Sequence, residues 1–502
     1  MKRKKSRQPD FNRLLTGTFG LLFLISSLVI LLVDRASFSS TNQIFPPGSS
    51  VGGVPVAGLD SAEAQDRLQQ VFSLPVELQY RNARLQLNPA ELGFQIDSAA
   101  SLAQLGAQTA GLGWWPHLWG KAAGSGADVP LVYTLDENVL RSVLAQTFQP
   151  RYDQPPTAVL PIIGATNVTP GQPGWQLASL DEATAQVKQA LISPNARVVV
   201  LRVSELAALP IDPRNLEIQL KQTIQLAGFD GLAEVFLQDL SDGTRIHFAQ
   251  LHNQPVPVDV AYSAASTIKI PIMVSALRRL QEPLPTTATG WMTQMLTESL
   301  NPPADALMKN YLDFERGPLM VTADLTELGY VNTFLAGYFE PGSPLLQQFS
   351  TPANTRQDVF IDPDVYNQTV PSEIGDLLAR IYACADGGAA AGLFEGQVTP
   401  SECQLVLDLL KQNKIGSLIE AGLPSNVSVA HKHGWTSELD GLLHTLSDAG
   451  IVSSPDRDYV LVIFLHSSQQ LIFDTQNRLF AKLSQSIYNA YNPGQQAIWL
   501  AN

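Results

Sequence analysis

The sequence predicts an α+β protein in which an N-terminal transmembrane helix precedes small α+β modules and a C-terminal domain, an antiparallel sheet with a helical insertion. Three observations support this class. The chain has 502 residues, and single hydrophobic cores stop growing at roughly 250 to 300 residues. Residues 14–33 contain no charge. Residues 213–502 begin and end with strand-like sequences.

Composition excludes several classes of protein. The chain is 45% apolar, 16% charged and 8% aromatic, which is typical of globular domains and excludes a disordered chain, a collagen or a coiled-coil rod. Two cysteines exclude a disulfide scaffold and a four-cysteine metal site. A net charge of −14 argues against a nucleic-acid partner, because such binding relies on Lys and Arg. We expect no cofactor.

The first element is an apolar helix behind a basic flank. Residues 14–33 would form a helix about 30 Å long, the thickness of a membrane's hydrocarbon core. The basic residues 1–13 are then expected in the cytoplasm, and the tether of residues 34–44 and all later domains outside the cell membrane. A cleaved signal peptide is the alternative, but its apolar region is shorter and ends at small residues, whereas Asp34 and Arg35 follow here. The flank contains Lys2, Arg3, Lys4, Lys5, Arg7, Arg13 and one anion, Asp10.

Residues 45–206 are interpreted as two copies of a small α+β unit, residues 45–110 and 111–206. In both copies a Gly-aromatic sequence, 93–97 and 174–177, precedes a helix. The predicted strands are 76–80 and 198–203, and the predicted helices are 61–72, 98–109, 136–147 and 181–191. Residues 111–126 are predicted to be a loop. Trp114, Trp115 and Trp119 there either form an exposed binding platform or, as is more usual for aromatic residues, pack into a core.

Three stretches of this region resemble a known family. They read FPPGSSVGGVPVAGLDSAEAQDRL, LNPAELGFQID and PPTAVLPIIGATNVTPGQPGWQL. They are similar to the peptidoglycan-binding modules found in surface proteins beside VanW-like or other wall-active domains. The resemblance implies cell-wall peptidoglycan as a partner. A region that only spaces the C-terminal domain from the membrane is the alternative.

The C-terminal domain, residues 213–502, has strands at both of its ends. Strand-like runs at 232–240 and 244–251 are joined by Asp242-Gly243, a dipeptide typical of tight hairpins. Residues 459–465 form a continuous apolar run typical of a buried strand, and a closing helix follows near 474–491. Strands at both ends with helices between them predict one antiparallel sheet and a helical insertion.

A serine and a lysine at helical spacing are candidates for nucleophilic chemistry. Ser266 and Lys269 open an apolar helix, and positions i and i+3 share a helix face, so the lysine amine can reach the serine hydroxyl. Serine becomes an effective nucleophile when a base accepts its proton, and lysine can be that base once desolvation lowers its pKa. The helix N-terminus adds backbone amides near the reacting oxygen. This arrangement suits acyl transfer.

Two triplets extend the pattern. Ser299-Leu300-Asn301 is one of three S-x-N triplets, and Lys432-His433-Gly434 is one of two K-x-G triplets, the other being residues 414–416. In one combination alone, within one domain, the serine-lysine helix is followed by S-x-N between helices and by K-x-G on a strand. S-x-x-K, S-D-N and K-T-G in this order are the signature of class A β-lactamases and penicillin-binding proteins.

From about Gly228 onwards the chain resembles the class A branch of the serine β-lactamases. The fuller matches are YSAASTIKIPIMVSAL, MLTESLNPPADALM, YNQTVPSEIGDLLARIY and VAHKHGWTSELDGLLHTLSDAGIVSSPDRDYVLVIFL. The resemblance implies a membrane-anchored serine hydrolase that is acylated by β-lactams or by the D-alanyl peptides of peptidoglycan. It implies that Ser266 is the nucleophile, Lys269 its base and Ser299 the proton relay. Asn301 would orient Lys269 and a substrate amide, and Lys432 would supply positive charge and hold Ser299. The backbone amides of Ser266 and Trp435 would form the oxyanion hole, and Gly434 would let the substrate backbone lie against the strand.

Departures from the family's pattern predict altered activity. The interval between Ser266 and Ser299 is short for the family and implies a trimmed helical insertion. His433 replaces the threonine whose hydroxyl usually meets the substrate carboxylate. Class A enzymes carry a deacylating glutamate on the loop that corresponds to residues 341–372, where this chain has no glutamate. The loop offers Asp358, Asp362 and Asp364, and Glu340 lies just upstream as a weak candidate. We therefore expect a long-lived acyl-enzyme.

Three hypotheses remain open at this point. Cys384 and Cys403 form either a disulfide, which is favoured outside the cytoplasm, or two buried thiols. His431, His433 and His444 would be metal ligands only if a carboxylate completed the spacing, and since none does convincingly we expect no metal site. The rival function is a non-catalytic peptidoglycan-binding protein whose hydrolase domain has decayed, although the retention of all three motifs argues against decay.

Overall fold

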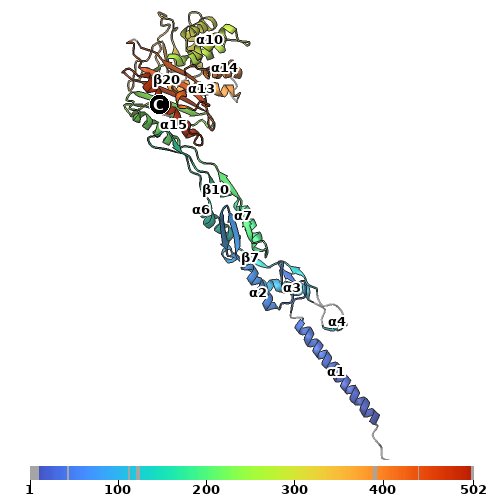
Figure 1. Ribbon diagram of the computed structural model, residues 1–502. Helices are drawn as coiled ribbons and strands as arrows, with labels where there is room; N and C mark the ends of the chain where they lie inside the picture. The colour runs from blue at the N-terminus through green and yellow to red at the C-terminus, as the bar shows by residue number, and fades with distance from the viewer. Residues whose placement is uncertain are drawn as a thin grey trace, which may run out of the picture. The chain divides into compact units, whose positions relative to one another are not determined.

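The computed structural model describes residues 11–41, 44–110, 114–119, 125–387, 393–415, 417–438 and 440–498. The chain forms two compact units, residues 1–155 with 173–206 and residues 156–172 with 207–502 (Figure 1). The predicted α+β class is confirmed. Residues 1–10 of the predicted cytoplasmic tail lie outside the described part of the chain, as do residues 111–113 and 120–124 of the predicted loop.

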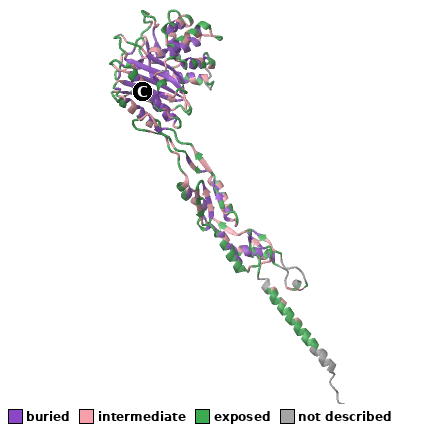
Figure 2. Ribbon diagram, in the orientation of Figure 1, coloured by how far each residue is buried: buried purple, intermediate pink, exposed green. Residues whose placement is uncertain are grey.

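The first element is the apolar helix α1 (Phe11–Thr41). Its segment Phe19–Ser39 is long and apolar enough to cross a membrane, and its apolar side chains are exposed (Figure 2). The helix continues beyond Val33, where the uncharged stretch ends, and includes Asp34 and Arg35.

The rest of the first unit is a set of short strands and helices with one shared core. Its elements are β1 (Ser50–Val51), β2 (Val54–Pro55), α2 (Ser61–Phe72), β3 (Val76–Tyr80), β4 (Ala83–Leu87), η1 (Pro89–Leu92), β5 (Phe94–Ile96), α3 (Ser98–Thr109), α4 (Trp114–Leu118), β6 (Asp128–Val129), β7 (Tyr133–Leu135), α5 (Glu137–Ser142), η2 (Val143–Phe148), α6 (Gln149–Tyr152), β10 (Gly174–Leu177), α7 (Leu180–Leu191), β11 (Val198–Val200) and β12 (Val203–Leu206). Helices α2 and α3 have the predicted bounds.

Strand pairing differs from the predicted division into modules 45–110 and 111–206. β1 pairs with β6, β3 with β11 and β5 with β7, so every one of these pairs crosses residue 110. Buried side chains from Val51 to Leu201 form one cluster. Strands of two to five residues bury too little surface to stand alone, which explains why the two halves share a core.

The tryptophan residues of the predicted loop do not enter this core. Trp115 is 67% and Trp119 82% exposed. Trp114 is half-buried, and its indole N–H donates to Asp34 of α1 at 3.0 Å. Trp115 and Trp119 therefore do not pack into the core.

The second unit is built on a six-stranded sheet in the order β15-β14-β13-β21-β20-β19, antiparallel throughout. The first strand of the domain, β13, pairs with its last strand, β21, from Leu232 opposite His466 to Asp239 opposite Tyr459. The predicted sheet from both ends of the domain is confirmed. The elements are β8 (Leu160–Pro161), β9 (Val168–Thr169), α8 (Pro213–Leu226), β13 (Leu232–Asp239), β14 (Arg245–Leu251), β15 (Gln254–Val256), β16 (Tyr262–Ser263), η3 (Ala265–Ile268), α9 (Lys269–Leu277), α10 (Thr286–Thr297), α11 (Asn301–Leu307), η4 (Met308–Leu312), α12 (Gly317–Glu327), β17 (Phe334–Leu335), β18 (Asn367–Thr369), α13 (Pro371–Ala385), α14 (Pro400–Leu410), η5 (Glu420–Gly422), β19 (Ser428–Trp435), β20 (Thr445–Ser453), β21 (Tyr459–His466) and α15 (Phe473–Tyr491).

Helices cover both faces of this sheet, and side chains of alternating residues divide between the two faces. Val462 and Phe464 of β21 pack into the core under the helical insertion, while Leu461 and Ile463 pack into the core under α8 and α15. Figure 2 shows the sheet as the most deeply buried part of the unit. The insertion, from β16 to α14, supplies one wall of the site described below.

Residues 156–172 belong to this second unit although the sequence placed them in a module before it. Val159 and Val168 join the core under α8 and α15. The side-chain amide of Gln496 donates to the Val168 carbonyl and its oxygen accepts the Val168 N–H, both at 2.9 Å. The hairpin β8–β9 is thus held by the last residues of the domain.

Candidate active site

Ser266 and Lys269 meet at the start of α9. Ser266 lies in the 3₁₀ turn η3, and the Lys269 Nζ donates to its Oγ at 3.0 Å. Ala265, just before the serine, has φ +45°, a region that non-glycine residues rarely occupy and that is often found at functional sites. Lys269 is fully buried, and burial lowers the pKa of its amine to about 7. A large fraction of this lysine is therefore the neutral amine near pH 7.

The Ser299-Leu300-Asn301 triplet connects α10 to α11 and surrounds the same amine. Lys269 Nζ donates to the Ser299 carbonyl at 2.6 Å and to Asn301 Oδ1 at 2.7 Å, and Ser299 Oγ lies 3.5 Å away. Ser299 has φ +60°, so the backbone turns sharply here and directs both the carbonyl and the hydroxyl towards Lys269.

The third triplet lies on the edge strand β19. Lys432 is fully buried, and its Nζ donates to Ser299 Oγ at 2.9 Å. Burial and the nearby Lys269 lower the pKa of the Lys432 amine well below its usual value. Ser299 therefore contacts both lysines, and the structure brings Ser266, Lys269, Ser299, Asn301 and Lys432 into one hydrogen-bonded group.

His433 and Gly434 have surroundings that differ from those predicted. His433 is buried, its Nε2 lies 3.3 Å from Lys432 Nζ, and its ring packs on Trp435 with the centroids 4.2 Å apart. At Gly434 an added Cβ would lie 2.8 Å from the Ala264 carbonyl oxygen, so glycine is required for the close approach of β19 to η3. Neither residue lines the pocket, whereas Trp435 and Thr436 do. Position 433 therefore supplies no hydroxyl to the pocket, whereas Thr436, three residues later, lines it.

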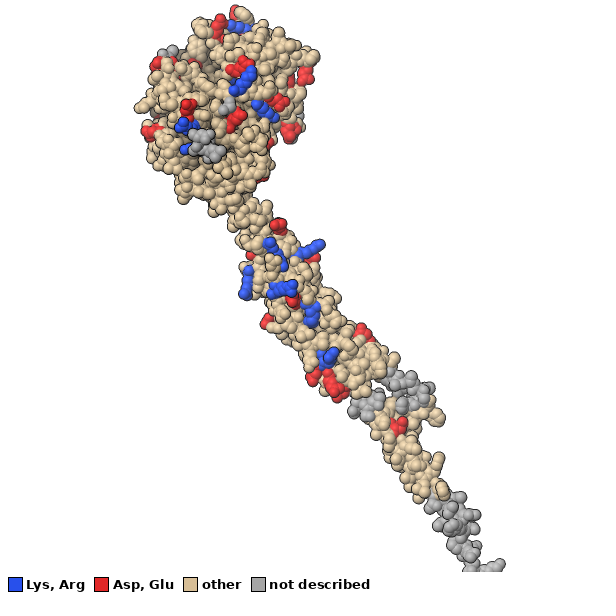
Figure 3. Space-filling view, in the orientation of Figure 1, with Lys and Arg blue, Asp and Glu red and all other residues tan. Residues whose placement is uncertain are grey.

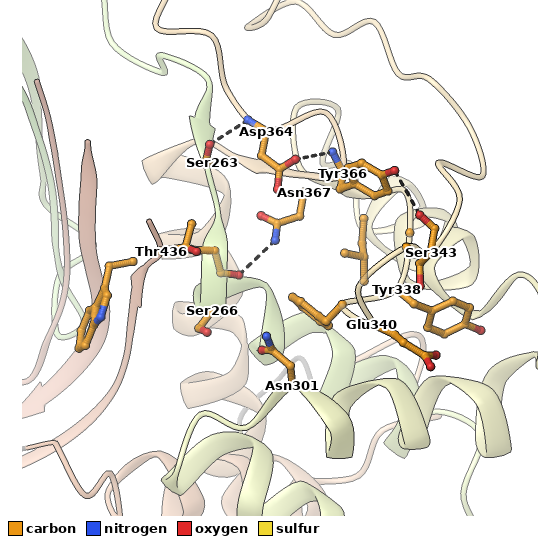
Figure 4. Close-up of a pocket in the computed structure, with 16 residues that line it drawn as sticks. Ser263, Ser266, Asn301, Tyr338, Glu340, Ser343, Asp364, Tyr366, Asn367 and Thr436 are labelled. Carbon is orange, nitrogen blue, oxygen red and sulfur yellow. Dashed lines mark hydrogen bonds between the residues drawn. The ribbon is translucent and has the colours of Figure 1, made fainter. Parts of the chain in front are cut away.

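A pocket of about 450 Å³ opens beside Ser266 (Figure 4). Its aromatic and polar lining includes residues that the sequence analysis did not single out for a role: Ser263, Tyr338, Phe339, Ser343, Tyr366 and Asn367. Asn367 donates from Nδ2 to the Ala265 carbonyl at 3.4 Å, while its buried Oδ1 has no partner among the described residues. In the sequence, this wall of the pocket corresponds to the segment YNQTVPSEIGDLLARIY, which begins with Tyr366 and Asn367.

The four carboxylates considered for deacylation differ in position. Glu340 lines the pocket, but its carboxylate is paired with Lys309 at 2.8 Å and, in Figure 4, points away from Ser266. Asp364 also lines the pocket, accepts the Tyr366 N–H at 2.9 Å, and burial raises its pKa. Asp358 pairs with Arg356 and, like Asp362, does not line this pocket. The hydrogen-bond partners of Lys269 in the described structure include no carboxylate.

The cysteines and the remaining histidines have structural partners. Cys384 of α13 and Cys403 of α14 form a disulfide with their Cα atoms 5.9 Å apart, which favours an extracytoplasmic location. His444 hydrogen-bonds Asp440 at 2.8 Å, whereas His431 hydrogen-bonds Asp448, so the two histidines have different carboxylate partners. Glu234, His247 and Asp259 form a further His-carboxylate cluster, where the Glu234 carboxylate accepts the backbone N–H groups of Asp259 and Val260.

The surface charges agree with the composition. On the face drawn in Figure 3, the described Lys and Arg residues lie among Asp, Glu and uncharged residues and form no continuous basic patch.

Comparisons with known proteins locate a family in the second unit. Residues 285–491 match the sequence model of Beta-lactamase2, described as the beta-lactamase enzyme family, and the match includes Ser299, Asn301 and Lys432 but begins after Lys269. The C-terminal unit thus contains a β-lactamase family domain. No curated protein matches the chain.

Solved structures resemble about half of the chain. The ancestral class A β-lactamase of Gram-negative bacteria is 21% identical, with 55% of this chain and 100% of that chain covered and a TM-score of 0.40. A β-lactamase from Chitinophaga pinensis is 16% identical, with 55% and 99% covered and a TM-score of 0.42. A mutant of PBP-A in an acyl-enzyme complex with penicillin G is 19% identical, with 56% and 97% covered and a TM-score of 0.40. Likenesses at this level carry no argument about activity.

Proposed function

We propose that the β-lactamase family domain of the C-terminal unit is a serine hydrolase that is acylated at Ser266 by β-lactams or by related D-alanyl peptides. The observation that carries the proposal is the setting of the Lys269 amine. Its pKa is lowered to about 7, it lies 3.0 Å from Ser266 Oγ, and it donates hydrogen bonds to Ser299 and Asn301. Burying a lysine amine against a serine hydroxyl costs free energy of desolvation, so we would not expect a domain that had lost its activity to retain this arrangement.

Acylation then proceeds in three linked movements of protons and electrons. Lys269 accepts the Ser266 proton while Oγ attacks the amide carbonyl carbon. Backbone amides of Ser266 and Trp435 stabilise the oxyanion of the tetrahedral intermediate. When that intermediate collapses, the C–N bond breaks and Ser299 gives its proton to the leaving nitrogen. The Lys269 ammonium, whose Nζ lies 3.5 Å from Ser299 Oγ, then returns to Ser299 the proton that it took from Ser266. The product is an ester of Ser266.

Replacing Lys269 by methionine should lower the rate of acylation by about 10²–10⁴-fold, because a positioned general base contributes that much to its step.

In the unaltered protein the rate of acylation should also depend on pH. The amine is the active form and its pKa is about 7, so the rate should fall as pH drops through 7 and level off above it. Labelling rates of the full-length protein in detergent with a fluorescent penicillin at several pH values measure both effects.

Lys414 offers a matched control for this experiment. It belongs to the other K-x-G triplet, and its side chain is 64% exposed and paired with Glu298 at 2.6 Å. Lys414→Met should label at the normal rate with the normal pH profile. A Lys269→Met protein that labels as fast as Lys414→Met would contradict the assignment of Lys269 as the base.

The proposal also includes anchoring by α1, which is supported by its apolar segment Phe19–Ser39 and by the basic residues before it. In intact cells, external protease should digest the chain beyond Arg35 and leave a small membrane-held fragment. Sequencing the N-terminus of the protein in membranes and in the medium provides the measurement. Released protein with a new N-terminus near Ala36 would show cleavage of a signal sequence instead.

Cell-wall peptidoglycan is the proposed partner of the first unit. The resemblance of its sequences to wall-binding modules and the exposed rings of Trp115 and Trp119 support this role, since exposed aromatic rings suit stacking on sugar rings.

A further inference from the structure

A chain of polar side chains continues from Lys432 to the buried carboxylate of Asp448 on β20. The Asp448 oxygens lie 2.9 and 3.0 Å from His431 Nδ1. His431 Nε2 lies 3.0 Å from Nδ2 of Asn413, and the same Nδ2 lies 3.4 Å from His433 Nδ1. His433 Nε2 faces Lys432 Nζ at 3.3 Å, which completes the chain. Both histidines, the aspartate and the lysine are buried.

The orientation of the Asn413 amide determines where each histidine carries its proton. Asn413 Oδ1 accepts the Ile415 N–H at 3.1 Å, so the donor Nδ2 faces the two rings. His431 Nε2 and His433 Nδ1 are then acceptors. The proton of His431 therefore lies on Nδ1, towards Asp448, and the proton of His433 lies on Nε2, towards Lys432.

This pattern requires Lys432 to be a neutral amine. A ring N–H directed at Nζ needs a lone pair to accept it, and only the amine has one. The two hydrogens of the amine are donated to Ser299 Oγ at 2.9 Å and to the His433 carbonyl at 3.1 Å. All three hydrogen-bonding positions of the amine are thus used.

Protonation of His431 is incompatible with this arrangement. Asp448 raises the pKa of His431 to about 9, which favours a second proton on the ring. That proton would lie on Nε2 and meet the hydrogens of the Asn413 amide. The hydrogen bond to His431 re-forms when the amide turns and presents Oδ1 to both rings, a turn that breaks the hydrogen bond from the Ile415 N–H to Oδ1. The His433 proton then moves from Nε2 to Nδ1, and the lone pair of its Nε2 faces a Lys432 that can be an ammonium.

We propose that Asn413 couples the protonation of His431 to that of Lys432 through the tautomer of His433. Three charged groups lie next to this row of polar side chains in the described structure. They are Asp448, Glu420 and, beside Lys432, Lys269; the Glu420 Oε2 lies 3.6 Å from His431 Nε2. Asn413, His431 and His433 are positioning residues, since none of them lines the pocket. The consequence for acylation rests on the proposed function, whereas the coupling itself does not.

Nitrogen NMR of ¹⁵N-histidine in the full-length protein in detergent tests the coupling, because the two ring nitrogens report the tautomer directly. The chain has seven histidines, and His431→Gln and His433→Thr assign two of their signals. In the unaltered protein, His433 should change from the Nε2–H to the Nδ1–H tautomer at the same pH at which His431 gains its proton. A His433 tautomer that stays constant while His431 titrates, or a His431 that keeps one charge between about pH 5 and pH 10, would overturn the proposal.

Two variants of Asn413 separate coupling from simple packing. Asn413→Asp can only accept from the rings, so His433 should remain the Nδ1–H tautomer throughout. Asn413→Leu has no polar atom, so His431 should titrate while His433 no longer follows; a His433 that still follows would contradict the mechanism. His252→Gln, at an exposed histidine, is the control and should leave the coupled transition unchanged. Failure of penicillin labelling would count against the proposed function alone, since these signals need no activity.

Discussion

Ser266→Ala should abolish covalent labelling of the full-length protein by a fluorescent penicillin. The reason is stoichiometric, since the acyl group forms an ester with Ser266 Oγ and alanine has no oxygen to acylate. The measurement is in-gel fluorescence after denaturation, which removes non-covalent label. The effect should be complete, and adding more probe should not restore it.

Ser401→Ala is a suitable control for this result. Ser401 is an exposed serine on α14 that contacts Glu282 at 3.0 Å and does not line the pocket. It should label like the unaltered protein. Equal labelling of Ser266→Ala and Ser401→Ala would remove the enzymatic interpretation, as would absence of label from the unaltered protein at high probe concentration.

Deacylation should be slow. Lys269 hydrogen-bonds no carboxylate in the described structure. Of the two carboxylates that line the pocket, Glu340 is paired with Lys309 and Asp364 accepts the Tyr366 N–H. Without a base to activate the attacking water, that step loses about 10²–10⁴-fold in rate, or roughly 3–5 kcal/mol of transition-state stabilisation. A chromogenic cephalosporin should therefore give a stoichiometric burst followed by a slow steady rate.

Variants of the two carboxylates that line the pocket refine this expectation. Glu340→Gln should change the steady rate little, because the Glu340 side chain is held by Lys309. Asp364→Asn tests the other carboxylate, which lines the pocket and whose pKa is raised by burial. Fast, sustained hydrolysis by the unaltered protein would contradict slow deacylation, and its loss in Asp364→Asn would identify the base.

The fold of the C-terminal unit could be predicted because its signals are local. The Asp242-Gly243 hairpin and the apolar run of β21 are readable from the sequence, and they mark the first and last long strands of the domain. The first unit was harder. Its strands have two to five residues, and their partners, such as β3 and β11, are far apart in the sequence, so repetition suggested two modules where the structure has one core.

The chemical triplets could be predicted for a similar reason, whereas their surroundings could not. Spacing placed Lys269 on the face of Ser266, and motif order added Ser299 and Lys432. The direction in which a strand residue points beside a turn depends on tertiary packing. The sequence therefore gave no sign that His433 would be buried against Lys432 while Thr436 lines the pocket.

Acylation at Ser266 is tested by the mass of the full-length protein at successive times after mixing with excess benzylpenicillin. We expect one penicilloyl adduct per chain, located by peptide mapping on the segment that contains Ser266 and persisting long after free penicillin is removed. A protein that stays unmodified, or an adduct on any other segment, would contradict it.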